Sequence, residues 1–257
     1  MDLLHAAILG IVEGLGEFLP ISSTAHVVFA AKILNIAQSD FTKTFEIAIQ
    51  SGAILAVVIL YAKKLLIERK VLEKVLFAFV PTAILGFIFY KIIKQLLIGN
   101  ILISLIALFV GGLLIIYFER LFKKRENNLT IKQLNNFQAV LIGVSQSIAV
   151  IPGVSRSAAT ILPSMFFGLS RKEAVEFSFM LAIPTMFAAT GYDLLKNIKL
   201  LTSSNVGILS IGFVVSFITA VVTVKWFLQF VKTNTLIPFA IYRILIAVVL
   251  YFVFFKI

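Results

Sequence analysis

Chemically active side chains gather in two short segments of an otherwise apolar chain, EGLGEFLPISSTAH (Glu13 to His26) and PGVSRSAAT (Pro152 to Thr160). Carboxylates, hydroxyls, a histidine and an arginine are costly inside a lipid bilayer unless they pair with one another or serve a ligand. These two segments are therefore where we expect a functional site.

Glu13 and Glu17 are four residues apart, so on a helix they lie one turn apart on the same face. Two like charges there repel each other unless a cation neutralises them or one carboxylate holds a proton. Carboxylate oxygens suit Mg²⁺ or Ca²⁺, and either cation would also bind phosphate oxygens. The spacing favours a metal site; the alternative is one interfacial carboxylate beside a buried partner that shares a proton.

Arg156 stands between Ser155 and Ser157, directly after Pro152-Gly153, where a helix would begin. A guanidinium, two hydroxyls and the free backbone N–H groups of a helix N-terminus together form a phosphate cradle. The alternative is an ion pair between Arg156 and one of the glutamates that only joins the two segments. Either way, the segments are expected to meet.

His26 and the hydroxyls of Ser22, Ser23 and Thr24 complete the first segment. An imidazole can act as general acid or base near neutral pH, although an isolated helical histidine is more often a packing residue. The hydroxyls could cap a helix, which is their commonest role, or bind or attack phosphate. Ser23 is the better candidate nucleophile, because an internal repeat pairs it with Ser155.

Three further polar residues lie in apolar surroundings. Gln50 and Gln146 are expected near the same depth as the two segments, where they would supply hydrogen bonds. Arg243 lies within the last apolar run, and snorkelling or a structural ion pair is favoured over catalysis there.

Composition indicates an integral membrane protein. Of the 257 residues, 60% are hydrophobic and 14% are charged, and the mean hydropathy is +1.06, which excludes an ordinary soluble domain. The net charge of +11 does not indicate nucleic acid, because basic residues such as Lys63-Lys64 end apolar runs, where they act as topology signals. Without cysteine there is no disulfide or thiolate site, and no cleavable signal peptide is expected at the N-terminus.

A weak internal repeat pairs Ser23 with Ser155. It predicts a single membrane domain, residues 1–257, made of two related halves, about 1–120 and 133–257.

Each half is expected to begin with a broken helix and to continue with three membrane-spanning helices. In the first half the spanning runs are 44–62, 75–90 and 101–118. Residues 3–34 are apolar but interrupted at Pro20, which cannot continue a helix. A re-entrant helical hairpin fits this pattern, since its irregular tip is tolerated where it packs in protein or lines a cavity. The expected fold is an all-α polytopic membrane protein with six transmembrane helices and two re-entrant hairpins.

Three crossings in each half force the second half into inverted topology, so that the two hairpin tips enter from opposite faces and meet near the midplane. On this arrangement fourteen Lys and Arg residues, from Lys63 to Lys232, fall on one side, and seven, from Lys32 to Lys256, fall on the other. The positive-inside rule puts the larger set in the cytoplasm. Both termini and the mouth of the first hairpin are then expected on the outer, periplasmic face.

Both segments resemble the signature motifs of the bacterial undecaprenyl-diphosphate phosphatases, the bacitracin-resistance family, which usually read EGLTEFLPVSSTGH and PGxSRSGATI. The resemblance extends over nearly the whole chain, including TFEIAIQSGAILAVV, GLSRKEAVEFSFMLAIP and FLQFVKTNTLIPFAIYRI. This chain departs from the usual pattern at Gly16, Ala25, Ser51 and Ala158, and none of these changes removes an ionisable group.

The resemblance implies a hydrolase of the bacterial inner membrane that converts undecaprenyl diphosphate to the monophosphate and inorganic phosphate. That reaction renews the lipid carrier for peptidoglycan and cell wall biogenesis, maintains cell shape and confers bacitracin resistance. The resemblance also implies an inverted-repeat fold, a divalent cation and a homodimer. Matching positions give the expected catalytic residues Glu13, Glu17, Ser23, His26 and Arg156, with Glu13 and Glu17 as metal ligands. The expected substrate-binding residues are Ser22, Thr24, Gln50, Gln146, Ser155, Arg156 and Ser157.

A polyprenyl-phosphate flippase is the main alternative, because inverted repeats whose broken helices meet at the midplane are also a transporter design. Such a protein would bind the anionic headgroup without cleaving it. A purely structural scaffold would leave the buried ionisable residues unexplained. Whether water or Ser23 attacks the phosphorus, and whether His26 acts as acid or base, stays open at the level of sequence.

Overall fold

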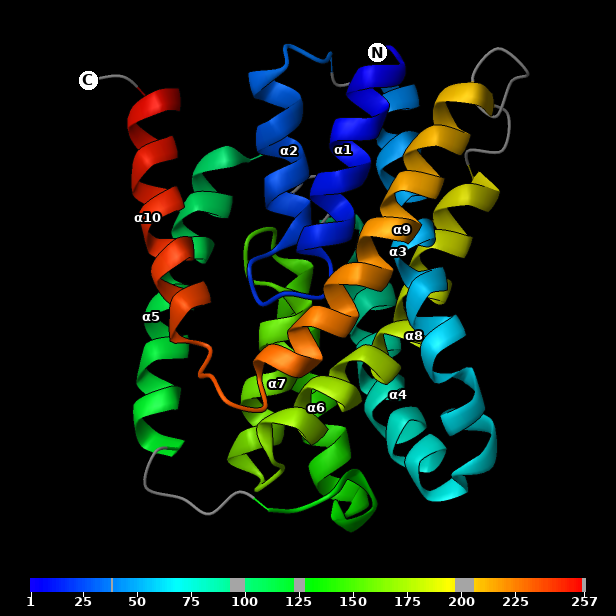
Figure 1. Cartoon of the computed structure of the whole chain (residues 1–257), viewed down its shortest axis with the longest axis vertical. Helices are drawn as coiled ribbons and strands as arrows, with labels where there is room; N and C mark the ends of the chain where they lie inside the picture. Colours follow the sequence, from blue (N-terminus) through cyan, green and yellow to red (C-terminus); the bar gives the residue numbers. More distant parts are fainter. Residues whose placement is uncertain (38, 93–99, 123–127, 197–205, 256–257) are drawn as a thin grey trace.

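The computed structural model describes residues 1–37, 39–92, 100–122, 128–196 and 206–255, which form a bundle of helices (Figure 1). Its α-helices are α1 Leu3–Gly16, α2 Ser23–Ile33, α3 Asp40–Ile67, α4 Arg69–Ile92, α5 Ile101–Phe122, α6 Asn136–Ser147, α7 Arg156–Phe166, α8 Arg171–Lys196, α9 Val206–Phe230 and α10 Ile237–Phe254. Two 3-10 turns, Ile131–Gln133 and Ile148–Val150, flank α6.

Six helices of the described chain, α3, α4, α5, α8, α9 and α10, are long and apolar enough to cross a membrane. The three runs expected in the first half, 44–62, 75–90 and 101–118, lie within α3, α4 and α5. The prediction of six long apolar helices is therefore confirmed. The other four α-helices have 11 to 14 residues, fewer than the roughly 20 that a crossing needs.

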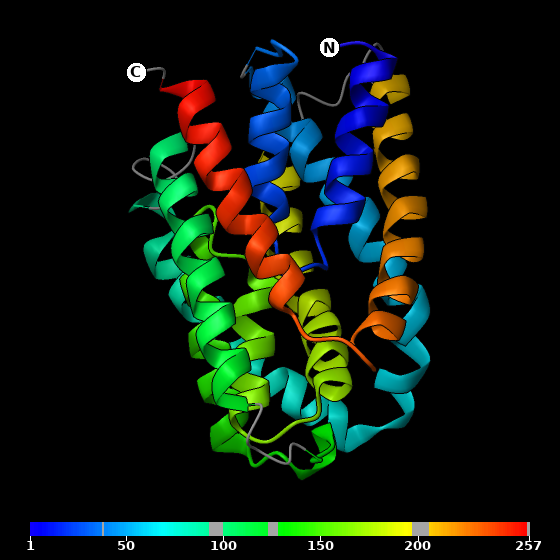
Figure 2. The same ribbon diagram turned by 60° about the vertical axis from the view of Figure 1, so that its left-hand side comes forward.

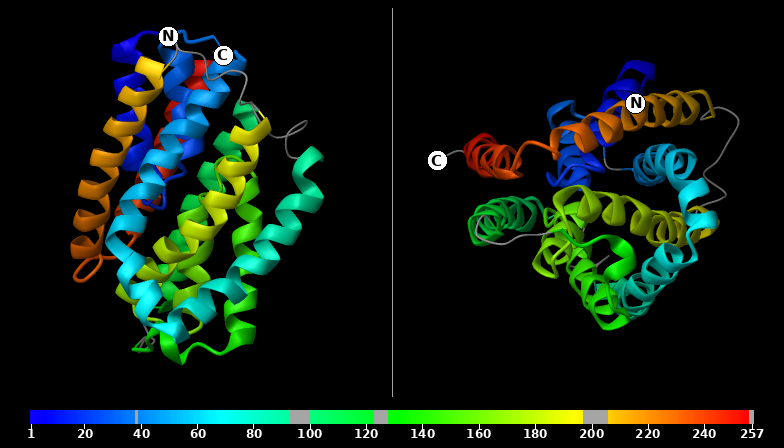
Figure 3. Two further views of the ribbon diagram at one scale, coloured as in Figure 1. Left: turned by 90° about the vertical axis from the view of Figure 1, so that its right-hand side faces the viewer. Right: turned by 60° about the horizontal axis from the view of Figure 1, so that its bottom comes forward.

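The short helices form two pairs at opposite ends of the molecule. In Figure 1, α1 and α2 occupy the upper half, α6 and α7 occupy the lower half, and the loop joining each pair reaches the middle. The rotated view in Figure 2 shows the same separation, with both termini at the upper end. The long helices α3 and α9 pack together along the length of the bundle (Figure 3, left).

Small residues allow α1 to pack closely against α9. A Cβ atom at Gly10 would lie 2.7 Å from the carbonyl oxygen of Gly212, and one at Gly14 would lie 2.6 Å from that of Ser216. Real Cβ atoms do not approach backbone oxygens so closely. The position of α1, and of the carboxylates it carries, therefore depends on glycine at these two sites.

We expect Gly14→Ala to lower the free energy of unfolding by about 1–3 kcal/mol, the usual cost of overpacking a tight contact. Gly86 in α4 is the matched control, because a Cβ there meets nothing within 4 Å. Gly86→Ala is expected to stabilise the helix by about 0.5–1 kcal/mol. Thermal unfolding in detergent measures both changes, and shifts of the same sign would contradict the account of α1 packing.

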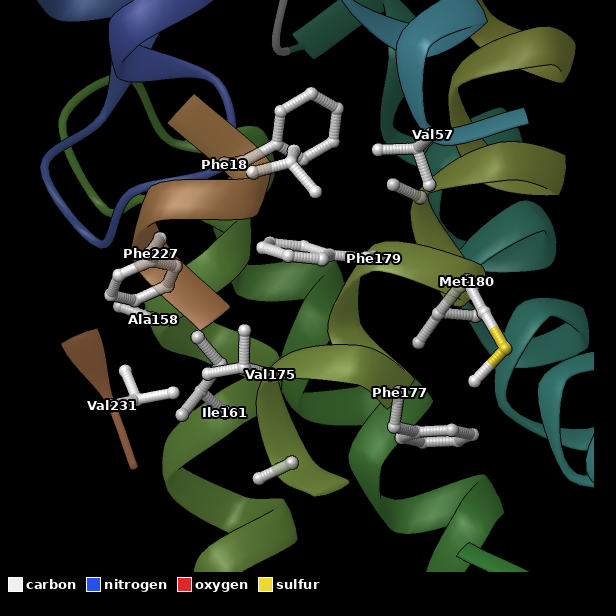
Figure 4. Close-up of a cluster of buried hydrophobic side chains, with 14 of the residues drawn as sticks. Phe18, Val57, Ala158, Ile161, Val175, Phe177, Phe179, Met180, Phe227 and Val231 are labelled. Carbon is white, nitrogen blue, oxygen red and sulfur yellow. The ribbon is translucent and has the colours of Figure 1, made fainter. Parts of the chain in front are cut away.

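The largest apolar cluster lies directly beside the loop that joins α1 to α2. Phe18, in that loop, meets Phe179 of α8 edge-on with ring centroids 5.2 Å apart, and Phe227 of α9 lies 6.2 Å from Phe179 (Figure 4). All three side chains are fully buried. Aromatic contacts of this geometry add to the stabilisation from burial, so Phe18 anchors the loop in the core.

Ion pairs join the helices at the lower end of the bundle. Arg171 donates to both carboxylate oxygens of Glu119, at 3.1 and 2.7 Å, and Glu119 also accepts the backbone N–H of Leu236. Lys64 pairs with Glu176 at 2.5 Å. Among the basic residues counted for topology, those outside the described residues are Lys94, Lys123, Lys124, Arg125, Lys199 and Lys256.

Candidate functional site

The first tip is the loop between α1 and α2. Glu13 and Glu17 lie one turn apart at the end of α1, where the N–H of Glu17 donates to the carbonyl of Glu13 at 2.9 Å, and both residues are buried. The chain then turns through Pro20, and α2 begins at Ser23. The expected interruption of this segment is therefore confirmed.

The second tip is the loop before α7. Gly153 has a φ of +97°, which glycine adopts without strain, and Ser155 has a φ of +74°. The Ser155 hydroxyl accepts the backbone N–H of Ala158 at 3.2 Å and so caps α7. Ser22 occupies the same place before α2, with a φ of +71°. Counted from these helix starts, Ser22 rather than Ser23 corresponds to Ser155.

Arg156 joins the two tips. Its Nε donates to Oε1 of Glu17 and its Nη2 to the Glu17 carbonyl oxygen, both at 3.3 Å. Its Nη1 donates to the carbonyl of Ser178 in α8 at 3.0 Å. The hydroxyl of Ser157 donates to the carbonyl of Phe18 at 2.9 Å. The expectation that the two segments meet is confirmed.

Glu17 also binds Ser23. The Ser23 hydroxyl donates to Oε2 of Glu17 at 2.6 Å, and both side chains are buried. A carboxylate at this distance can take the proton of a serine hydroxyl as that oxygen attacks an electrophile. Glu17 therefore contacts Arg156 of the second tip through Oε1 and Ser23 of the first tip through Oε2.

Glu13 stands beside this group. Its Oε1 is buried and has no hydrogen-bond partner among the described residues. Hard oxygen ligands of this kind fit Mg²⁺ or Ca²⁺. In the part of the chain that the structure describes, no three His, Cys, Asp or Glu side chains converge to hold a metal ion, so a cation held here by Glu13 and Glu17 would need further ligands of another kind.

His26 faces α10. Its Nδ1 lies 2.8 Å from the carbonyl oxygen of Ser22, and its Nε2 lies 2.9 Å from the hydroxyl of Tyr242. The imidazole and the Tyr242 ring are stacked, with centroids 5.5 Å apart and planes inclined by 17°. Both ring nitrogens thus contact groups other than the carboxylates.

The remaining expected site residues are dispersed. Gln146 is buried and donates to Thr82 of α4 and Thr185 of α8, at 2.8 and 3.1 Å, so it joins helices below the tips. Thr24 is exposed at the start of α2, and Gln50 is half-buried in α3. Of the expected residues, hydrogen bonds bring together Glu17, Ser23, Arg156 and Ser157 with the backbone of the first tip.

Arg243 holds both tips from α10. The residue is fully buried, so the expectation that its side chain snorkels to the surface is wrong, and no ion pair is needed to explain its burial. Its guanidinium donates five hydrogen bonds of 2.8 to 3.2 Å to backbone carbonyls, two on α5 and three on the tips. The acceptors are Leu108, Ala107, Pro20, Val154 and Gly153.

Sequence reasoning missed two residues beside the site. Glu46 of α3 is close enough to Glu13 to act on it electrostatically. Its signal was a carboxylate in an apolar run, one helical turn before Gln50. Tyr242 gave no such signal, because a tyrosine at the edge of an apolar helix is ordinary.

Comparisons with known proteins agree with the motifs. A family model described as "Bacitracin resistance protein BacA" matches residues 6–249. The undecaprenyl-diphosphatase of Aquifex aeolicus is 52% identical over 245 residues, which cover 95% of this chain and 96% of that protein. The undecaprenyl-diphosphatase of a Sulfurihydrogenibium species is 49% identical and covers 98% of this chain and 99% of its own length. This chain therefore belongs to the BacA family of bacitracin resistance proteins.

Proposed function

We propose that this protein hydrolyses undecaprenyl diphosphate to undecaprenyl phosphate and inorganic phosphate in the cell membrane. The observation that carries the proposal is the contact of Arg156 and of the buried Ser23 with one carboxylate, Glu17, where the two tips meet. The relatives reported above are named for a diphosphatase, which supports hydrolysis over the flippase alternative. Renewal of the lipid carrier for cell wall synthesis then follows as the biological role.

Arg156 is the residue we assign to the diphosphate. Its three bonds to Glu17 and Ser178 leave N–H groups on both Nη atoms for phosphate oxygens. It also stands at the first position of α7, where backbone N–H groups attract anions. Glu13 and Glu17 are the residues that would hold Mg²⁺ or Ca²⁺, which would supply positive charge to the same oxygens.

Glu17 is the proposed general base. As the attacking oxygen bonds to the terminal phosphorus, its proton passes to Glu17 and the anhydride bond breaks, so that undecaprenyl phosphate leaves. If Ser23 attacks, water then hydrolyses a phosphoserine to release inorganic phosphate; if water attacks directly, inorganic phosphate forms in one step. The 2.6 Å bond from Ser23 to Glu17 supports the first route, and trapping of a covalent phosphoserine would distinguish the two.

The prenyl chain of the substrate can lie against apolar helices. An apolar cavity of about 420 Å³ is lined by α5, α6 and α7 and includes Val154 and Ala158, which flank the site residues of the second tip. Hydrocarbon chains are accommodated in cavities of this composition. Its position beside the second tip supports a lipid substrate.

We further propose that α1–α2 and α6–α7 are re-entrant hairpins in two inverted halves. Their placement at opposite ends of the bundle supports this (Figure 1), and so does the identical order of a short pair followed by three long helices. Under the positive-inside rule, the excess of basic residues supports a cytoplasmic lower end. The termini and the opening of the site would then face the periplasm.

Phosphate release from a long-chain prenyl diphosphate by the purified protein in detergent tests the function. We expect release with Mg²⁺ or Ca²⁺ and a loss of at least about 100-fold with EDTA, since a metal ion contributes several kcal/mol of charge stabilisation. Full activity in EDTA would show that the reaction does not need a divalent cation. A folded protein that releases no phosphate but moves the lipid between leaflets of a vesicle would establish the flippase instead.

A further inference from the structure

The contacts of His26 define which of its nitrogens carries the proton. A carbonyl oxygen only accepts hydrogen bonds, so Nδ1, which lies 2.8 Å from the Ser22 carbonyl, is the protonated nitrogen. In the neutral ring Nε2 is then an acceptor. The Tyr242 hydroxyl, 2.9 Å from Nε2, is the donor that completes the pair.

Two features fix the position of Tyr242. Its ring stacks on the imidazole, and the next residue, Arg243, is fully buried and bonded to both tips. The turn of α10 that carries Tyr242 is therefore fixed to the same loops that carry Glu17 and Arg156. Tyr242 is about two-fifths exposed, so burial alone does not account for this residue at this position.

We propose that Tyr242 is a positioning residue for the reaction, which fixes the orientation of His26 and keeps Nε2 as its proton-accepting nitrogen. The inference rests on the proposed phosphatase function and on the expectation from the sequence that His26 acts in it as an acid or base beside Glu17. The ring has two directional contacts, one on each nitrogen. Without the Tyr242 hydroxyl the contact of Nδ1 with Ser22 is the remaining hydrogen bond of the ring, so the orientation of the imidazole about its Cβ–Cγ bond is held less firmly.

Tyr242→Phe is the direct test, because it keeps the stacked ring and removes only the hydroxyl. We expect the turnover number for phosphate release to fall about 10- to 100-fold, the usual effect of removing a group that orients a functional histidine. The KM is expected to stay within about twofold, since the prenyl chain and diphosphate contacts are retained. Tyr251→Phe on the same helix is the matched control, because the ring of Tyr251 contacts Phe252 and Phe255 and not His26.

A double-mutant cycle separates positioning from a structural role. In a His26→Ala background, Tyr242→Phe is expected to cause no further loss of turnover, because its target is already absent. An equal loss with and without His26 would overturn the proposal. So would wild-type turnover in Tyr242→Phe.

Nitrogen NMR provides a readout that does not depend on activity. The chain has two histidines, His5 and His26, so His5→Gln leaves a single imidazole to observe in ¹⁵N-histidine-labelled protein. At a pH where the ring is neutral, we expect a protonated Nδ1 and a hydrogen-bonded Nε2, and Tyr242→Phe should move the Nε2 resonance to that of a nitrogen without a donor. A protonated Nε2 in the neutral ring would refute the assigned tautomer even if the phosphatase function holds.

Discussion

Glu17→Gln is expected to lower the turnover number for phosphate release by about 100- to 10,000-fold, the range for loss of a general base. The amide keeps the size of the side chain but cannot take a proton from Ser23, whose hydroxyl lies 2.6 Å from Oε2. It also removes the negative charge that faces Arg156 and one of the two proposed metal-binding carboxylates. Phosphate release under saturating substrate measures the change.

Glu176→Gln is the matched control for this prediction. Glu176 is a buried glutamate, but it pairs with Lys64 and Lys172 at the lower end of the bundle rather than at the tips. Its substitution should leave turnover per folded molecule within about twofold, because neither substrate nor the reacting atoms reach it. If Glu17→Gln and Glu176→Gln lowered turnover equally, the loss would reflect removal of a buried carboxylate in general. The role given to Glu17 would then be wrong.

Arg243→Met is expected to lower the free energy of unfolding by at least about 3 kcal/mol. Five carbonyls would lose their donor at once, and each buried polar group left without a partner costs about 1–3 kcal/mol before relaxation. Methionine fills much of the volume, so the loss reflects the hydrogen bonds rather than a cavity. Thermal or denaturant unfolding in detergent measures it.

Two further variants serve as controls for Arg243→Met. Arg120→Met removes an exposed arginine from the end of α5 and should change stability by less than about 0.5 kcal/mol. Arg243→Lys keeps the charge but lacks the planar fork that reaches several carbonyls, so it should fall between wild type and Arg243→Met. If Arg243→Met proved as stable as Arg120→Met, the two tips would not depend on this residue.

The helices and the contact between the tips were predictable because their signals are local or strongly constrained. Long apolar runs predict α3, α4 and α5, and Pro20 interrupts an apolar segment that would otherwise continue as one helix. A buried arginine needs an acidic or carbonyl partner, and an ion pair of Arg156 with one of the two glutamates was the alternative role that the sequence left open. The orientation of the halves in the membrane and the metal site remain predictions.

The contacts of Arg243 and Gln146, and that of His26 with Tyr242, were not predictable, because each is made across a large separation in sequence. Arg243 donates to carbonyls as far away as Pro20, and backbone carbonyls carry no residue-specific signal. Gln146 has an amide that suits phosphate as well as it suits Thr82. The residue type limits which groups a side chain can bind, but the packing of α10 and α6 determines which partner Arg243 or Gln146 meets.

Arg243 also affects the electrostatic potential at the tips. Each of its five bonds ends on a neutral carbonyl oxygen, whereas the charge of Arg156 is opposed by Glu17. Its positive charge is thus solvated by dipoles, and none of its five acceptors carries a negative charge. Dissolved ions screen a charge held away from water much less than a surface charge. The contribution of Arg243 to the attraction of a diphosphate should therefore persist at high ionic strength, unlike that of the exposed lysines at the ends of the helices.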